Sequence, residues 1–148
     1  MGFPASVGVF WKVADRFAVR PEFNFSKTKT DDEPTTWSVG TGVTGLFYLN
    51  SGNPLRTYVA PRFTYARQHL DDEDFFSFES STNLYSLSGL FGAQYLLGDR
   101  FLVFGELGVR GGYSSGRETF SGPTFSFDNE PTGYTLGSTG GVGIVLLF

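Results

Sequence analysis

Residues 84–97 read Leu-Tyr-Ser-Leu-Ser-Gly-Leu-Phe-Gly-Ala-Gln-Tyr-Leu-Leu, and this stretch decides the fold class. Tyr85, Leu87, Phe91 and Tyr95 occupy odd positions, while most even positions hold small or polar residues. A period of two is the pattern of a β-strand with one apolar face. Strands of soluble domains average about five or six residues, whereas a tilted membrane-spanning strand needs about 9–11. Pattern and length together predict a spanning strand.

The same alternation recurs along the whole chain, and no stretch keeps the 3.6-residue period of a helix. We therefore predict one domain over residues 1–148, an all-β, antiparallel up-and-down transmembrane β-barrel. The predicted strands are the seven segments 3–13, 17–26, 35–49, 55–67, 84–97, 101–114 and 132–148.

Composition agrees with this class of protein and excludes several others. The 148 residues include 20 Gly and 18% aromatic residues, but only 18% charged residues, against about 25% in soluble domains. The mean hydropathy of −0.10 fits a barrel, because lipid-facing residues alternate with polar ones. Without Cys and with a single His, a disulfide scaffold, a Cys zinc site and a multi-His metal site are excluded, and we expect no cofactor. The net charge of −4 argues against nucleic acid as a partner.

The connections between segments alternate between short and long. Short turns are expected at 14–16, 50–54 and 98–100, and long polar loops at 27–34, 68–83 and 115–131. Eleven of the 15 acidic residues fall in the long segments. Outer-membrane barrels have short periplasmic turns and longer extracellular loops, so we expect the acidic loops outside the cell.

Aromatic residues on the apolar face form two predicted belts. One group lies near the short turns and the other near the long loops, as expected at the two membrane–water interfaces. Aromatic packing inside a soluble sandwich is the alternative. The first group is Trp11, Phe17, Phe47, Tyr95, Phe101 and Phe148, and the second is Trp37, Tyr65, Tyr85, Tyr113 and Tyr134.

The chain resembles the small eight-stranded outer-membrane barrels of the OmpA transmembrane-domain, OmpX and "outer membrane protein beta-barrel domain" type. The resemblance is carried by the hairpin over 6–23 and by the last strand, Gly140-Gly-Val-Gly-Ile-Val-Leu-Leu-Phe148. It implies a bacterial outer-membrane location, contact with outer-membrane lipid, and delivery by the barrel-assembly machinery. The implied assembly signal is Val142, Ile144, Leu146 and Phe148.

Seven segments are one fewer than this family has. If the last strand ends in the periplasm, segment 3–13 takes the place of the family's second strand. We therefore expect an upstream strand and a signal to be missing, the alternative being an odd-stranded barrel, which is uncommon in bacterial chains. Segments 3–13 and 132–148 run in the same direction, so they either pair in parallel or leave a gap.

Charged residues on the predicted inner face must pair, because the interior of a small barrel is narrow. We expect Arg20–Glu22 and Glu106–Arg110 to be neighbours along their strands, and Arg62 to lie on the same inner face. Two readings stand: a packed polar network that plugs the barrel, or a narrow path for ions or solutes.

The acidic loops hold the remaining candidates. A surface or partner site is proposed for Asp71, Asp72, Glu73, Asp74, Phe75, Phe76 and Phe78. The phenylalanines either mark a partner site or fold back over the barrel mouth. Carboxylate runs suit Ca²⁺ or Mg²⁺, but a solvated loop is the stronger interpretation, and His69 has no recognisable catalytic spacing.

The sequence therefore predicts a non-enzymatic outer-membrane protein. Its expected role is envelope structure, or interaction with an extracellular ligand or host surface through the acidic loops. The alternative is a narrow passive pore or small-solute channel through the charged interior.

Overall fold

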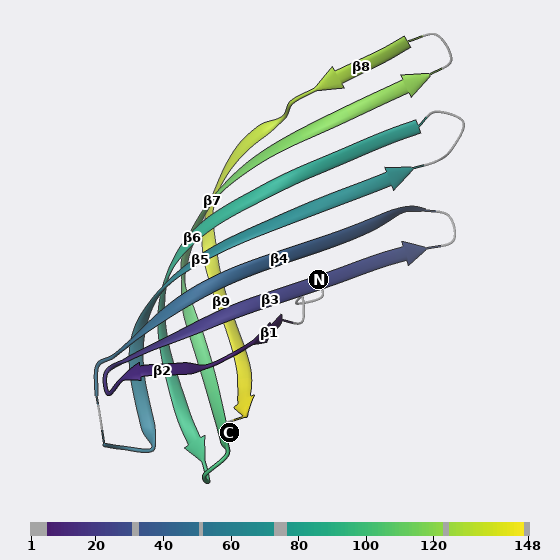
Figure 1. Ribbon diagram of the computed structural model, residues 1–148. Helices are drawn as coiled ribbons and strands as arrows, with labels where there is room; N and C mark the ends of the chain where they lie inside the picture. Colours follow the sequence, from purple (N-terminus) through teal and green to yellow (C-terminus); the bar gives the residue numbers. More distant parts are fainter. Residues whose placement is uncertain (1–5, 31–32, 51, 73–76, 123–124, 147–148) are drawn as a thin grey trace.

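The computed structural model describes residues 6–30, 33–50, 52–72, 77–122 and 125–146. They form a single antiparallel sheet (Figure 1). The described residues include no helix, and so none that could cross a membrane. The strands are β1 (Ser6–Gly8), β2 (Trp11–Ala14), β3 (Phe17–Thr30), β4 (Glu33–Tyr48), β5 (Leu55–Asp72), β6 (Ser77–Leu97), β7 (Phe101–Gly122), β8 (Phe125–Asn129) and β9 (Thr132–Leu146).

β1 and β2 are two parts of one pass of the chain along the sheet, and so are β8 and β9. The first pass is interrupted opposite Pro21 of β3, and the second at Pro131. β1 and β2 pair with β3 in nearly one register, and β8 and β9 pair with β7 in one register. The Pro21 carbonyl accepts a bond from the Val9 N–H at 3.0 Å, and the Pro131 carbonyl accepts one from the Gly116 N–H at 2.8 Å. In an antiparallel pair, the N–H and the C=O of a hydrogen-bonded residue point to the same neighbouring strand. Each proline accepts a bond through its C=O there but has no N–H to donate back. The nine strands therefore make seven passes, one for each predicted segment.

The predicted long loops are the main correction to the sequence analysis. Segments 27–34, 68–83 and 115–131 are mostly strand, because β3 and β4, β5 and β6, and β7 and β8 continue to pair through them. We call these three paired polar extensions the hairpin arms. Pairing satisfies the backbone N–H and C=O groups of each arm, so the arm does not require an apolar face. The arms all extend toward one end of the sheet, and the short connections lie at the other (Figure 1). There, Gly52 and Gly98 take the positive φ values of 90° and 67° that these connections require.

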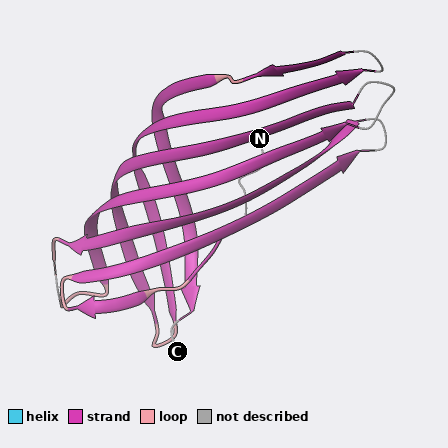
Figure 2. Ribbon diagram, turned by 45° about the horizontal axis from the view of Figure 1, so that its top comes forward, coloured by secondary structure: helices cyan, strands magenta, loops and turns pink. Residues whose placement is uncertain are grey.

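The sheet is strongly curled and open-edged (Figure 2). β3 to β7 follow one another in sequence order, with β1 and β2 on β3 at one edge and β9 on β7 at the other. In the part of the chain that is described, no pairing joins the two edges. Of the two outcomes expected for the first and last segments, the structure shows the gap.

Alternation of side chains divides the sheet into two faces. Along β6, Ser88, Leu90 and Gln94 are buried on the inner face, whereas Leu87 and Phe91 are exposed on the outer face. The predicted fold class, an antiparallel up-and-down all-β sheet curled as in a barrel, is confirmed. The inner-face core consists of Ala18, Leu46, Tyr48, Tyr58, Ala60 and Leu90.

Candidate functional site

Four charged side chains from three strands meet on the inner face. We call them the buried charge network: Arg20 and Glu22 from β3, Arg62 from β5 and Glu106 from β7. The side chains of Arg20 and Glu106 are only 5% and 1% exposed, and those of Arg62 and Glu22 are 18% exposed. The network sits at even positions of strands whose odd positions face outward, so the period of two places it there.

Glu106 is the centre of this network. Both of its carboxylate oxygens accept bonds from Arg20 Nη2, at 2.7 and 2.9 Å. Arg62 Nη2 donates to Glu106 Oε2 at 2.6 Å, and the Tyr58 hydroxyl donates to Oε1 at 2.8 Å. One carboxylate therefore joins β3, β5 and β7 across the inner face.

Glu22 completes the charge balance. Its Oε1 accepts a bond from Arg20 Nε at 2.6 Å and a longer one from Arg62 Nη2 at 3.4 Å. Arg62 Nε donates in turn to Thr44 Oγ1 at 2.9 Å, and the Arg20 guanidinium lies 4.4 Å from the centre of the Phe104 ring. Two arginines thus face two glutamates, which is the arrangement that buried charges need to offset their lost hydration. In the described part of the chain, every buried side-chain polar atom has a hydrogen-bond partner.

The structure brings together four of the five charged residues that the sequence placed on the inner face. The expected Arg20–Glu22 neighbours are in contact, but the expected Glu106–Arg110 pair does not form. Arg110 is exposed and has no ion pair within the described residues. Glu106 instead has its partners on other strands. The curl of the sheet brings side chains of β3 and β5 closer to Glu106 than Arg110, which lies four positions along β7. Tyr58 and Thr44 join the network, and their even positions were the signal for this placement.

The outer face carries aromatic rows at the places where the belts were predicted. Tyr65, Tyr85, Tyr113 and Tyr134 stand opposite one another on four adjacent strands. The Tyr65 and Tyr85 rings lie 5.1 Å apart, and the Tyr113 and Tyr134 rings 5.2 Å. Near the short turns, the Phe17 and Phe47 rings lie 4.8 Å apart. The outer face therefore has aromatic groups at both ends and exposed aliphatic side chains between them.

The predicted assembly signal lies on the edge strand β9. Val142 and Ile144 point to the outer face and are 89% and 73% exposed. Leu146 ends β9, and its side chain lies outside the described part, as does Phe148 entirely. The apolar alternation expected of the signal is therefore present at the two positions that can be seen.

Asp71 and Asp72, two of the acidic residues proposed as an interaction site, lie on a paired strand rather than in a loop. Asp71 and Asp72 belong to β5 and Phe78 to β6, paired as Asp71↔Glu79 and Asp72↔Phe78. The side chains of these three candidates lie outside the described part, and so do Glu73, Asp74, Phe75 and Phe76. On the same hairpin, His69 Nε2 of β5 lies 3.7 Å from Glu79 Oε1 of β6, and the His69 ring lies 5.4 Å from that of Trp37.

Comparisons with known proteins give limited help. No protein-family model matches the sequence, and no curated protein does. Among solved structures, the chain is similar to the ferric yersiniabactin uptake receptor FyuA from Yersinia pestis, with 12% identity and a TM-score of 0.49. The alignment covers 94% of this chain and 24% of the receptor, so the chain spans about a quarter of the receptor's length. At this similarity the likeness carries no inference about function.

Proposed function

We propose that this chain is a non-enzymatic β-barrel protein of the bacterial outer membrane, with a role in envelope structure or surface interaction. The observation that carries the proposal is the inverted distribution of side chains. Arg20 and Glu106 are buried on the inner face, whereas large apolar residues such as Leu107 and Val109 are 67% and 65% exposed on the outer face. A soluble sandwich buries its apolar face, whereas a membrane barrel turns it toward lipid.

The height of the apolar band supports the same proposal. On β6, the outer-face residues Tyr85 and Tyr95 are ten positions apart, or about 33 Å along the strand. With the tilt of about 40° that is typical of such strands, this corresponds to an apolar band about 25 Å high, the value for outer-membrane barrels. Outer-membrane lipid is therefore the first partner that we propose, and the barrel-assembly machinery, reading β9, is the second.

The buried charge network supports a structural role for the inner face. Its carboxylates and guanidinium groups are engaged with one another, so none is held ready for a substrate. A network that is satisfied internally ties strands together and fills the interior, which favours a plug over an open path. The net charge of −4 disfavours nucleic acid as a partner.

The paired hairpin arms are the proposed interaction elements. β5 continues for seven residues beyond Tyr65, and β6 starts eight residues before Tyr85, so this hairpin projects about 25 Å past the tyrosine row. On the neighbouring arm the acidic residues make cross-strand contacts, such as Arg117–Glu130 at 3.3 Å and Thr119–Asp128 at 3.0 Å. Stiff acidic arms are suited to an extracellular ligand or host surface with basic groups.

Hairpin replacement tests the interaction role. Since His69 and Ser81 are paired, residues 70–80 can be replaced by Asn-Gly, which closes a two-residue hairpin turn. We expect the variant to insert normally but to lose binding to immobilised matrix proteins or cultured host cells. A second variant replaces 119–128 by Asn-Gly between the paired Glu118 and Asn129, and it measures how much the neighbouring arm contributes to binding. Equal binding by wild type and both variants would remove the interaction role and leave the structural one.

Conductance separates the structural role from the pore that the sequence left open. In planar bilayers we expect no opening above leak for the wild type, because the buried charge network occupies the inner face. We also expect Arg62→Ala and Glu106→Ala to remain silent, since the Arg20 and Tyr58 side chains still fill the interior. Stable wild-type openings that change with either variant would favour the pore.

A further inference from the structure

A cavity of about 590 Å³ lies at the short-turn end of the inner face. Its walls come from the β1–β2 segment, from β4 to β7 with the turn before β5, and from β9, so it lies within the curl of the sheet and borders both edges. Its volume lies in the range of about 300–1,000 Å³ that is typical of small-molecule sites. The buried charge network does not line it, so the cavity is a separate feature of the fold.

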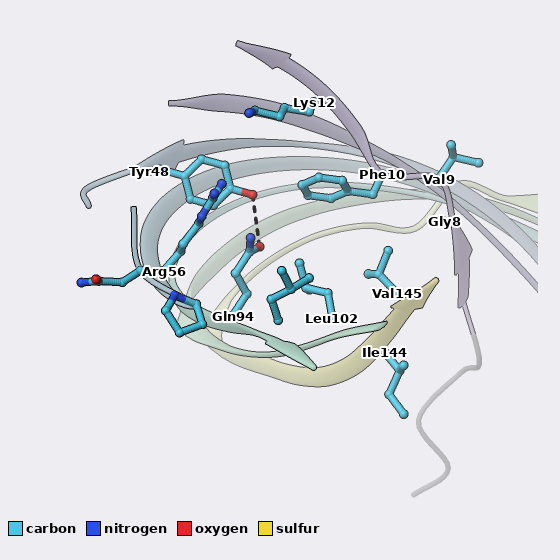
Figure 3. Close-up of a pocket in the computed structure, with 13 residues that line it drawn as sticks. Gly8, Val9, Phe10, Lys12, Tyr48, Arg56, Gln94, Leu102, Ile144 and Val145 are labelled. Atoms are coloured by element: carbon cyan, nitrogen blue, oxygen red, sulfur yellow. Dashed lines mark hydrogen bonds between the residues drawn. The ribbon is translucent and has the colours of Figure 1, made fainter. Parts of the chain in front are cut away.

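One side of the cavity is apolar. Phe10, from the segment between β1 and β2, Leu102 from β7 and Val145 from β9 reach toward the same hollow (Figure 3). Leu102 is buried at 5% exposure, and Phe10 packs against the inner-face core. Val9 and Ile144 instead point away from the hollow (Figure 3). This wall offers contact to an alkyl chain but no hydrogen-bonding group.

The opposite side of the cavity is polar and cationic. The Tyr48 hydroxyl donates to Gln94 Oε1 at 3.1 Å, which satisfies both groups. The half-buried Arg56 lies with its guanidinium 5.6 Å from the centre of the Tyr48 ring. Lys12, at the rim, pairs with the exposed Asp15 at 3.2 Å. Among the described residues, two cations therefore line the cavity and no acidic residue does.

Arg56 differs from the other inner-face arginines. Arg20 and Arg62 are each held by glutamates, and those two pairs balance completely. Arg56 has no ion pair within the described residues. A half-buried guanidinium facing a cavity without a carboxylate favours an anionic group in that cavity.

The cavity adjoins the apolar outer face at the edges of the sheet. β1–β2 and β9 are not paired in the described chain, and Ile144, which helps to line the cavity, is 73% exposed on the outer face.

We propose that this cavity binds a long-chain fatty acid, with its carboxylate against Arg56 and its alkyl chain against Phe10, Leu102 and Val145. The cation and the apolar wall stand at opposite sides of one cavity, which matches the two ends of such a ligand. The site goes beyond the proposed structural and interaction role and does not rest on it, because binding can be measured without a bilayer.

Binding of tritiated hexadecanoate to the purified protein in neutral detergent micelles tests the site, with empty micelles subtracted. We expect one equivalent bound, displaced by unlabelled hexadecanoate and not by hexadecyltrimethylammonium, which has the same chain and the opposite charge. Arg56→Gln should weaken hexadecanoate binding about tenfold, the loss expected for one charge-assisted hydrogen bond. Arg56→Lys should restore most of it, and tritiated hexadecanol should bind Arg56→Gln and wild type alike.

Arg100→Gln is the matched control, because Arg100 is exposed in a turn at the same end and does not line the cavity. Phe10→Ala should weaken hexadecanoate and hexadecanol equally, and circular dichroism verifies that each variant is folded. The site is overturned if the cationic probe competes equally, if Arg56→Gln and Arg100→Gln behave alike, or if no saturable binding occurs. Equal displacement by two-chain phosphatidic acid would overturn the fatty acid as the occupant.

Discussion

Glu106 is the residue on which the inner face depends most. Its carboxylate accepts hydrogen bonds from Arg20, Arg62 and Tyr58. Glu106→Gln removes the negative charge and leaves the guanidinium groups of Arg20 and Arg62 with only Glu22 between them. Breaking one side of a buried ion pair costs about 3–5 kcal/mol, so we expect a loss of that size in the free energy of unfolding, measured by urea titration in lipid vesicles.

Glu130→Gln is the control for this substitution. Glu130 pairs with Arg117 on a hairpin arm, where both side chains are well exposed. Exposed pairs contribute about 0–1 kcal/mol, so this variant should unfold like the wild type. Equal, small effects of the two substitutions would contradict the central position of Glu106.

Gly92 is a second residue whose size matters. A Cβ at this position would overlap the ring of Tyr58, which is fully buried and donates to Glu106. We expect Gly92→Ala to displace that ring and to lower the free energy of unfolding by about 1–3 kcal/mol. Gly89, on the same strand, has open space around its Cβ position. Gly89→Ala should therefore be neutral or slightly stabilising, and the same urea titration compares the two.

For single residues, the sequence predicts the face of the sheet on which a side chain lies better than it predicts the ion-pair partner of that side chain. The period of two placed Arg20, Glu22, Arg62 and Glu106 on one face because parity is a local property of a strand. The pairing of Glu106 with Arg110 failed because spacing along one strand says nothing about neighbours brought in by curling. Contacts such as Arg20–Glu106 join residues 86 positions apart, and no local pattern encodes them.

At the scale of elements, prolines explain where strands are interrupted. Pro21 removes a donor opposite Val9, and Pro131 removes one opposite Gly116, which divides two passes into β1 with β2 and β8 with β9. The sequence shows these prolines but not which neighbour each faces, since that depends on strand register. The polar arms were missed for a related reason. A polar segment reads as a loop when taken alone, and only its partner strand shows that it is paired.

The outer face of β7 offers a test at the element scale. Leu107 lies near the middle of the apolar band and is 67% exposed, while Ser115 lies two positions beyond Tyr113 toward the hairpin end. If lipid covers the band, Leu107→Arg should cost about 2–4 kcal/mol, and Ser115→Arg only about 0–1, because the cost depends on membrane depth. Unfolding in vesicles measures both. Similar values for the two positions would indicate an outer face in water.

For the whole molecule, the decisive feature is a sheet with two faces of opposite character and with two edges that do not pair with each other among the described residues. The two faces follow from alternation and could be predicted from the sequence. So could the antiparallel order, because no segment has the helical period of a crossover that parallel neighbours would need. The curl and the cavity between β1–β2 and β9 could not. Both depend on how seven passes pack together, so they arise only when residues such as Phe10 and Val145 reach one space.

The two tryptophans report on how the whole molecule sits in a membrane. Trp11, near the short turns, is 70% exposed, and Trp37 lies toward the hairpin end. In vesicles, the single-tryptophan variants Trp37→Phe and Trp11→Phe should both be quenched more by bromines near the headgroups than by bromines near the bilayer centre. If all molecules insert with the hairpins outward, external iodide should quench Trp37 and spare Trp11, because the two rings lie at opposite interfaces. In detergent, iodide should reach both, which controls for intrinsic accessibility. Equal quenching of both by external iodide in vesicles would instead place the sheet outside the bilayer and contradict the membrane-spanning arrangement.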